Sequence, residues 1–279
     1  MQEKAVLLIE TEDERGLVYK VSSVLYEMQI NIDQNAEFVE KDIKRFFMRS
    51  EISGKFDESE LLFKIKNTLP EKAIVKVIPL KKKRIVLMVT KEPHCLGDLL
   101  VRHKFGELNA TIEAVIGNHD TLKELTEKFN IPFYFVDHSG MSRHEHEEKM
   151  AEIIDSYKPE YIVLAKFMRV LNPEFVKKYE NKIINIHHSF LPAFIGAKPY
   201  QQAYERGVKI IGATAHFVNN NLDEGPIIAQ SVISVDHSDS AENMAGLGRD
   251  VEKIVLARAL KLAFEDRVFV NRNKTVIFE

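Results

Sequence analysis

The sequence predicts an α/β protein in which a ferredoxin-like βαββαβ domain precedes a doubly wound, mostly parallel sheet. In the first part of the chain, four extended and two helical segments alternate in the ferredoxin-like order. Beyond residue 85, continuous apolar runs alternate with amphipathic stretches, as expected for strands that helices bury on both faces. A proline followed by a run of basic residues separates the two patterns. We therefore expect a first domain at 1–80, a linker at 81–84 and a second domain at 85–279.

The elements of the first domain follow from a change between extended and helical spacing of apolar residues. The expected strands are 5–10, 31–39, 45–52 and 73–79, and the expected helices are 16–29 and 57–69. A polar turn at 11–16 ends the first strand. The two middle strands are expected to pair antiparallel across the turn at 40–44.

The second domain is predicted to form a sheet with helices on both faces. The expected strands are 85–90, 112–117, 132–136, 160–165, 182–187, 210–218 and 226–235, with a terminal hairpin at 268–278. The expected helices are 95–104, 120–129, 143–157, 173–180 and 241–264. The last helix should bury Met244, Leu247, Val251, Ile254, Val255 and Leu262. Ligands of such sheets bind beyond the carboxyl ends of the strands, so we expect the site after the strand at 182–187.

Composition and charge limit the classes of function. The 279 residues are 45% hydrophobic and 29% charged, which is typical of a globular protein with a full core. A formal charge of −3 gives no general electrostatic reason to bind nucleic acid or an anionic membrane. The single cysteine excludes an intrachain disulfide and a multi-cysteine zinc site. Without a signal-peptide pattern or a membrane-length apolar run, we expect a cytoplasmic protein.

The segment 185–192 carries the strongest chemical pattern in the chain. Because side chains two apart on a strand share a face, Asn185 and His187 should point the same way at the mouth of the sheet. An amide donor beside an imidazole suits a carbonyl group, which the amide polarises while the imidazole handles a proton. Asp223, in a later turn-rich loop, could orient His187 and take a proton from water. By itself, an Asn-x-His pair also fits a structural strand histidine.

Together, Asn-Ile-His-x-Ser-x-Leu-Pro at 185–192 and Leu-Asp-x-Gly-Pro at 222–226 form a much more specific pattern. It resembles the catalytic signature of the folate-dependent formyltransferase family. The resemblance implies that Asn185, His187 and Asp223 are catalytic. His187 and Asn185 would stabilise the oxygen of a tetrahedral intermediate, and Asp223 would orient His187 and the attacking water.

Further segments extend the resemblance over nearly the whole chain to one branch of that family, the formyltetrahydrofolate deformylases. These segments lie at 91–98, 117–120, 165–171 and 193–200. The resemblance implies hydrolysis of 10-formyltetrahydrofolate to formate and tetrahydrofolate, which supplies formate for purine synthesis and balances the one-carbon folate pool. Water is the acceptor, so neither a cofactor nor a metal is expected. The alternative is formyl transfer to a small amine, which would require an acceptor for formyl release.

The same resemblance implies where the folate lies. Met168, Arg169, Val170 and Leu171 should form one wall of the pocket, and the loop before Asp223 the other wall. Plain core packing is the alternative for Met168 and Leu171.

The first domain is similar to an ACT domain, because an Asp-x-x-Gly turn precedes its first helix and Asn-Ile follows it. In that family the loop and helix start often bind an amino acid between paired domains. The similarity implies a regulatory site at Asp13, Gly16 and Asn31, with glycine or methionine as the effector, and a homo-oligomer formed through these domains. The alternative is that Gly16 only relaxes a turn and Asn31 only caps a strand. A sensor whose second domain is inert is a further alternative, against which the complete catalytic set argues.

Several other residues have side chains capable of chemistry. Cys95 follows His94, but adjacent side chains diverge on a helix or strand, so packing is favoured over a thiol nucleophile. His119 lies at a strand end, where substrate contact and a capping role are both open. His216 could line the pocket, and His188 should face away from Asn185 in a structural role.

His144 and His146 superficially suggest a metal site. They lie two apart on an expected helix and therefore face different directions. We expect both to lie on the solvated surface of that helix.

Overall fold

The computed structural model describes residues 3–193 and 199–279. Residues 194–198 of the motif at 193–200 lie outside the described residues. The chain divides into two compact units, Met1–Lys81 with Phe278–Glu279, and Lys82–Ile277. No helix within the described ranges is both long and apolar enough to cross a membrane.

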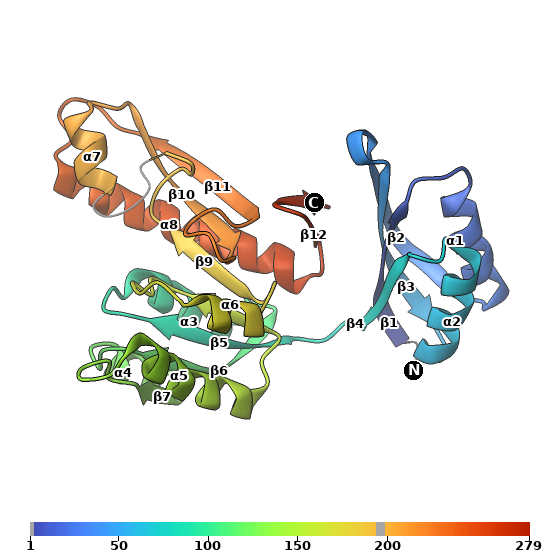
Figure 1. Cartoon of the computed structure of the whole chain (residues 1–279), viewed down its shortest axis with the longest axis horizontal. Helices are drawn as coiled ribbons and strands as arrows, with labels where there is room; N and C mark the ends of the chain where they lie inside the picture. The colour runs from blue at the N-terminus through green and yellow to red at the C-terminus, as the bar shows by residue number, and fades with distance from the viewer. Residues whose placement is uncertain (1–2, 194–198) are drawn as a thin grey trace. The chain divides into compact units, whose positions relative to one another are not determined.

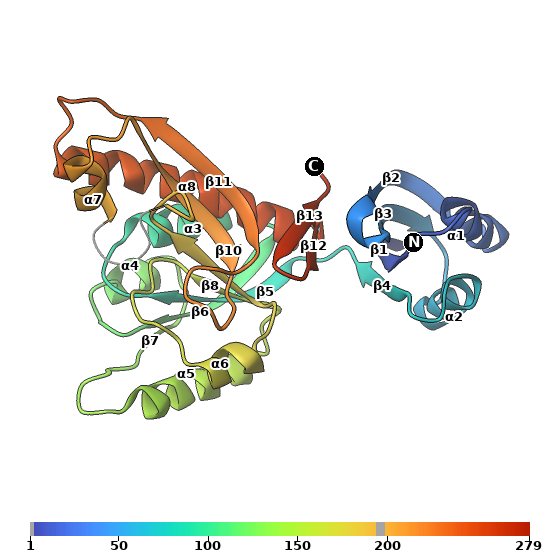
Figure 2. The same ribbon diagram turned by 45° about the horizontal axis from the view of Figure 1, so that its top comes forward.

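The first unit is a four-stranded antiparallel sheet with two helices on one face (Figure 1 and Figure 2). Its elements are β1 (Glu3–Glu12), α1 (Leu17–Glu27), β2 (Asn31–Glu40), β3 (Arg45–Gly54), α2 (Glu58–Thr68) and β4 (Ile74–Pro79). The strand order is β2-β3-β1-β4. The sheet buries Leu7, Ile9 and Met48 against Val21 and Leu61 of the helices. The predicted βαββαβ arrangement and the pairing of the two middle strands are confirmed.

The second unit contains a seven-stranded sheet of order β11-β10-β9-β8-β5-β6-β7. Its strands are β5 (Lys83–Val89), β6 (Ala110–Gly117), β7 (Phe133–Phe135), β8 (Tyr161–Leu164), β9 (Ile183–His187), β10 (Ile210–Phe217) and β11 (Ile227–Ser234). The strands from β7 to β9 run parallel, whereas β10 is antiparallel to both of its neighbours. A small hairpin, β12 (Val268–Asn271) and β13 (Lys274–Ile277), ends this unit. The predicted mostly parallel sheet is confirmed.

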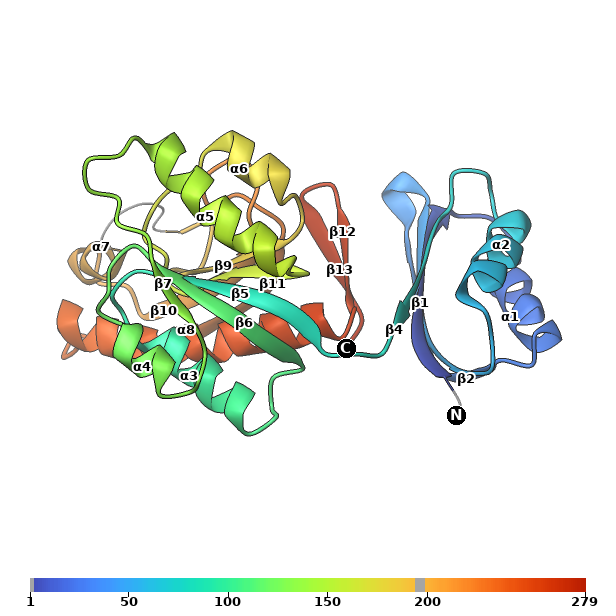
Figure 3. The same ribbon diagram turned by 90° about the horizontal axis from the view of Figure 1, so that it is seen from below.

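Helices cover both faces of this sheet (Figure 3). They are α3 (His94–Lys104), α4 (Lys123–Glu127), α5 (Arg143–Tyr157), α6 (Pro173–Lys178), α7 (Pro199–Glu205) and α8 (Ala241–Phe264). Figure 3 shows α5 and α6 on one side of the sheet, and α3 and α8 on the other. Each side has its own apolar core, one formed with α3 and α8 and one with α5 and α6. The two faces explain why the central strands are apolar throughout.

The long helix α8 differs from the predicted register at two positions. Ile254, expected to be buried, is 62% exposed, whereas Glu252 has no exposed surface. The buried face of α8 therefore contains a carboxylate that an apolar pattern cannot indicate.

The order of the strands determines where in the sheet a ligand site can form. After β5 the chain adds β6 and β7 on one side, then returns to add β8 and β9 on the other. Crevices for ligands form where the strand order reverses in this way, beyond the carboxyl ends of the strands. The segments that follow β5, β8 and β9 meet at this edge.

Candidate active site

The strand β9 carries the amide and imidazole predicted from the sequence. Asn185 and His187 both line a cavity, while Ile184 and Ile186 pack into the core formed with α3 and α8. This alternation is the period of two that a strand imposes. His187 is buried and Asn185 is half-buried, so both present polar atoms in a region with little solvent.

The loop between β10 and β11 brings Asp223 to His187. Asp223 Oδ1 lies 3.2 Å from His187 Nδ1. Burial alone would raise the pKa of Asp223, but the hydrogen bond and positive charge of His187 outweigh it and lower that pKa. The carboxylate therefore stays ionised and fixes which nitrogen of His187 carries the proton.

Gly225 determines how closely this loop can approach β10. A Cβ atom added at Gly225 would lie 1.7 Å from the carbonyl oxygen of Phe217. Asp223 itself has a positive φ of 58°, which a turn residue of this type tolerates. The Asp-x-Gly spacing thus places the carboxylate beside the strand that carries His216.

The second ring nitrogen of His187, Nε2, differs from Nδ1 in its surroundings. Nε2 is buried and has no hydrogen-bond partner within residues 3–193 and 199–279. Because Nδ1 donates to Asp223, Nε2 of the neutral ring carries a lone pair, and of the charged ring a proton. His187 lines the cavity, and Nε2 is its ring nitrogen without a competing partner among the described residues.

His216 is a further polar residue of the cavity whose role the sequence left open. Its Nδ1 lies 2.9 Å from the carbonyl oxygen of Phe217, which can only accept, so Nδ1 carries the proton. Nε2 then accepts from Asn185 Nδ2 at 3.3 Å. Burial, the largest influence, lowers the pKa of His216 and keeps it neutral. The antiparallel register pairs His216 with Asn185, and this pairing was the signal that could have placed it.

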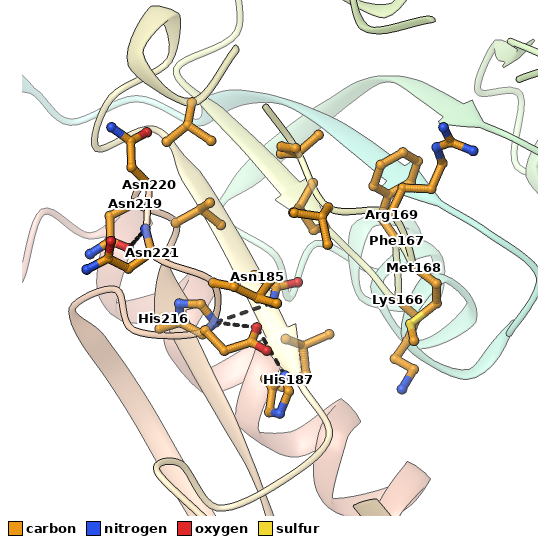
Figure 4. A pocket seen from close by; sticks show the side chains of 18 of the residues that line it. Lys166, Phe167, Met168, Arg169, Asn185, His187, His216, Asn219, Asn220 and Asn221 are labelled. Atoms are coloured by element: carbon orange, nitrogen blue, oxygen red, sulfur yellow. Dashed lines mark hydrogen bonds and ion pairs between the residues drawn. The ribbon is translucent and has the colours of Figure 1, made fainter. Parts of the chain in front are cut away.

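The cavity around these residues encloses about 540 Å³, within the range of small-molecule sites. Met168, Arg169, Val170 and Leu171 all line it. Figure 4 shows Met168 and Arg169 opposite Asn185 and His216. Met168 is 55% exposed, which argues against a core role. Leu171 does pack against the core formed with α5 and α6. Asn219 to Leu222 complete the wall before Asp223.

Of the remaining reactive side chains, Cys95 and His119 do not line this cavity, whereas His188 does. Cys95 is buried, and burial raises the pKa of its thiol far above the ordinary value, as its predicted packing role requires. His119 is half-buried and does not line the cavity; its ring contacts His138 edge to face. His188, expected to face away from Asn185, nevertheless lines part of the cavity and stacks on His187 with ring centroids 5.0 Å apart.

The expectation for His144 and His146 is half wrong. His144 is exposed and lies near Glu148 and Glu174, as expected. His146 is only 1% exposed, and its Nε2 lies 2.9 Å from the carbonyl oxygen of Val136. Because that hydrogen bond satisfies the ring, the helix can bury it, so His146 is a core residue.

The three residues expected at a regulatory site are all exposed in the first unit. Asp13 donates its backbone N–H to the carbonyl of Lys44. Gly16 is the N-cap residue of α1 and has a φ of 88°. Asn31 begins β2, and its amide donates to Asp33 at 2.7 Å. Gly16 therefore occupies a conformation that an L-residue rarely adopts.

An Asn-His pair and an aspartate at the carboxyl edge of a doubly wound sheet offer the groups that acid–base chemistry on an acyl group needs. The family model described as Formyl transferase matches residues 83–260. The formyltetrahydrofolate deformylase of Haemophilus influenzae is 60% identical over 277 residues, which cover 99% of this chain and 100% of that protein. The chain belongs to the formyltetrahydrofolate deformylase family.

Solved structures agree with this assignment. A formyltetrahydrofolate deformylase from Pseudomonas syringae has a TM-score of 0.95 and 41% identity, covering 100% of this chain and 95% of its own. A glycinamide ribonucleotide transformylase from Symbiobacterium toebii matches less well. Its TM-score is 0.68 and its identity 28%, over 71% of this chain and 94% of its own.

Proposed function

We propose that this protein hydrolyses 10-formyltetrahydrofolate to formate and tetrahydrofolate. The observation that carries the proposal is the state of His187, which lines the cavity, pairs its Nδ1 with Asp223 and leaves Nε2 without a partner among the described residues. A base held in this way can accept a proton from one reacting group and return it to another. Membership of the deformylase family supplies the substrate. The released formate would serve purine synthesis and the balance of one-carbon folates.

The reaction balances with water as the only second reactant. The water oxygen adds to the formyl carbon, and the former carbonyl oxygen becomes an oxyanion. One N–H of Asn185 is committed to His216, and the other can donate to that oxyanion together with protonated His187 Nε2. His187 takes one proton of the attacking water and passes it to the folate nitrogen, while ionised Asp223 stabilises the charged ring. The carbon–nitrogen bond then breaks and releases tetrahydrofolate and formic acid, which loses the second water proton to solvent and becomes formate.

Met168, Arg169, Val170 and Leu171 are proposed to hold the folate. Met168 and Val170 present exposed apolar surface on the cavity wall, which suits the flat face of a pterin ring. The backbone of Met168 is fixed, because its N–H donates to Thr90 Oγ1 at 2.9 Å. A wall that is fixed before the substrate arrives costs less ordering on binding.

Neither a metal nor a cofactor is required by this chemistry, because His187, held by Asp223, can transfer the water proton to the folate nitrogen. Formyl transfer to a small amine is not favoured. Full-length relatives at high identity are deformylases, whereas the named transformylase matches at 28% identity over 71% of the chain.

The decisive experiment supplies 10-formyltetrahydrofolate alone and measures formate and tetrahydrofolate together. We expect equimolar release of both without any amine, and loss of release in His187→Asn. Formyl transfer that begins only when an amine is added would overturn the proposal.

We further propose that the first unit senses an amino acid, glycine or methionine, near Asp13, Gly16 and Asn31. Deformylation conserves nothing except free tetrahydrofolate, so an unregulated enzyme would drain one-carbon units. The βαββαβ fold and the exposure of Asp13, Gly16 and Asn31 support this assignment. We also propose that the protein is a cytoplasmic homo-oligomer paired through these units.

A further inference from the structure

A buried carboxylate on α8 gathers three donors from distant parts of the second unit. Glu252 has no exposed surface. Its Oε2 lies 2.7 Å from His94 Nε2 and 3.3 Å from Lys166 Nζ, and its Oε1 accepts from the Tyr200 hydroxyl at 2.7 Å. Burial alone would raise the pKa of Glu252, but these partners lower it to about 2. The group is therefore a permanently charged buried anchor.

The first donor, Lys166, connects this anchor to the wall proposed to hold the folate. Lys166 is 4% exposed, lines the catalytic cavity and has a positive φ of 64°. It immediately precedes the segment Phe167–Leu171. A side chain held by a buried ion pair therefore fixes the point at which the wall begins, and the bond from Met168 N to Thr90 fixes the next turn.

The second donor, Tyr200, connects Glu252 to His187 through the ring of His188. The Tyr200 ring lies 6.1 Å from the ring of His188, which stacks on His187. The ring of Tyr200 can reach Glu252 only because Gly248 has no side chain. A Cβ atom at Gly248 would lie 2.0 Å from the tyrosine hydroxyl.

We propose that Glu252 is a positioning residue for the deformylase reaction, holding Lys166 and Tyr200 so that the folate wall and His187 keep their relative places. The inference rests on the proposed function. A charge buried in this way costs solvation, which apolar packing of the same volume would avoid, so fold stability is a weak reason for it. The convergence of all three donors at the carboxyl edge of the sheet supplies a stronger reason.

A metal site is the competing reading of the same cluster. His94, Cys95 and Glu252 offer ligand atoms within 4.8 Å of one another. However, the ammonium of Lys166 lies 3.3 Å from the carboxylate oxygen that would have to bind the ion. Two cations at one oxygen repel each other, so the geometry favours the ion pair.

The test compares two buried ion pairs. Glu252→Gln removes the charge at the active edge, and Asp266→Asn removes a matched charge from the pair with Lys83. Lys83 Nζ lies 2.8 Å from Asp266, its side chain is 4% exposed, and it begins β5 at the opposite edge of the sheet. For both variants, kcat and KM for 10-formyltetrahydrofolate, the Kd for tetrahydrofolate and the thermal unfolding midpoint are measured.

We expect both substitutions to lower the unfolding midpoint. Only Glu252→Gln should lower kcat/KM, by about 10–100-fold, because small misplacements of reacting groups slow the reaction strongly. Glu252→Gln should also weaken tetrahydrofolate binding, and Glu252→Asp should recover part of both losses. In a double-mutant cycle, the losses from Glu252→Gln and Lys166→Met should combine less than multiplicatively, because they act on one contact.

Equal kcat/KM and Kd in folded Glu252→Gln and Asp266→Asn would overturn the positioning role. If Glu252→Gln does not fold, Tyr200→Phe decides the question, since it removes one donor and leaves the charge pair intact. Unchanged kinetics and binding in that variant would overturn the proposal. A stoichiometric metal in the wild type that is lost in Glu252→Gln would replace it with the metal reading. A wild type that releases no formate would instead refute the proposed function. In that case the Kd for tetrahydrofolate in Glu252→Gln and Asp266→Asn would still test whether Glu252 positions the folate wall.

Discussion

At the scale of single residues, the chemistry depends on how each imidazole nitrogen around β9 is occupied. His187 donates through Nδ1 to Asp223, and its Nε2 has no partner in the described part of the protein. His216 donates through Nδ1 to a backbone carbonyl, and its Nε2 accepts a hydrogen bond from Asn185. Two histidines in one cavity therefore have different roles: one can exchange a proton, and the other orients an amide.

Replacing His187 or Asn185 should separate these roles. We expect His187→Ala to lower kcat by about 10²–10⁴-fold, the usual contribution of a general acid–base group. Asn185→Ala should lower it by about 10²–10³-fold, as for one oxyanion donor. Steady-state formate release measures both, and thermal unfolding checks that the variants fold. Near wild-type turnover in pure His187→Ala would refute the mechanism.

His188 should make stability depend on pH. Burial, followed by the charge of Lys166, lowers the pKa of His188 from 6.5 to about 4. Between these two pKa values the unfolded chain binds more protons at His188 than the folded chain does. The contribution of neutral His188 to the unfolding free energy is therefore fully present above pH 6.5 and is lost as the pH falls toward 4. The loss attributable to this residue should reach about 2–3 kcal/mol at pH 4.5.

Denaturant unfolding of His188→Gln at pH 7 and pH 4.5 measures that loss. The drop in unfolding free energy between the two pH values should be smaller in His188→Gln than in wild type. His144→Gln is the control, since the side chain of His144 is 59% exposed, and its drop should match wild type. An identical drop in all three proteins would contradict the assignment.

At the scale of elements, strands were easier to predict than the polar contacts between them. The apolar period of 182–187 was enough to place Asn185 and His187 on one face, because a strand has only two faces. The buried state of Glu252 was not predictable. Its donors Lys166 and Tyr200 lie far away in the sequence, and a carboxylate on a helix ordinarily faces solvent.

The helix α7 was missed for a related physical reason. Its seven residues are too few to show an apolar repeat and too few to be stable alone. Its buried residue Ala203 packs in a small core that includes Met244 of α8, so tertiary contact rather than local sequence stabilises it. His146 was misjudged because a backbone carbonyl, invisible in the sequence, satisfies its ring.

Two glycines of α8 provide an element-scale prediction. Gly248→Ala should displace the Tyr200 ring, whose Cζ lies 2.2 Å from the added Cβ, and so lower both the unfolding midpoint and kcat/KM. Gly246→Ala meets nothing closer than an Arg249 nitrogen at 3.8 Å. It should keep full activity and gain up to about 1 kcal/mol from helix propensity. Equal behaviour of the two variants in melting and kinetic assays would contradict the packing described for α7 on α8.

At the scale of the whole molecule, regulation should depend on the first unit and catalysis on the second. We expect glycine or methionine to change the activity of the full chain, with a coupling of about 1–3 kcal/mol in binding. A fragment that lacks residues 1–80 should lose this response while it keeps Asn185, His187 and Asp223. Formate release at varied amino-acid concentration measures the response.

Asn31→Ala in the full chain is the sharper variant, because it leaves the catalytic unit complete. It should abolish the response while the assembly, followed by light scattering, stays unchanged. A wild-type response in Asn31→Ala would refute the site, and no response in the wild type would refute the sensor.

The unpartnered Nε2 of His187 has a consequence for chemical labelling. The chain contains 10 histidines, but an electrophile attached to a folate would be delivered only to the cavity. Asp223 occupies Nδ1 of His187, so a haloacetyl folate that reacts with this residue should alkylate Nε2. Peptide mass spectrometry would then find modification confined to the histidines that line the cavity, His187 among them, and excess tetrahydrofolate would protect them. The same arrangement that supports proton transfer would make this protein open to a covalent inhibitor directed at one nitrogen atom.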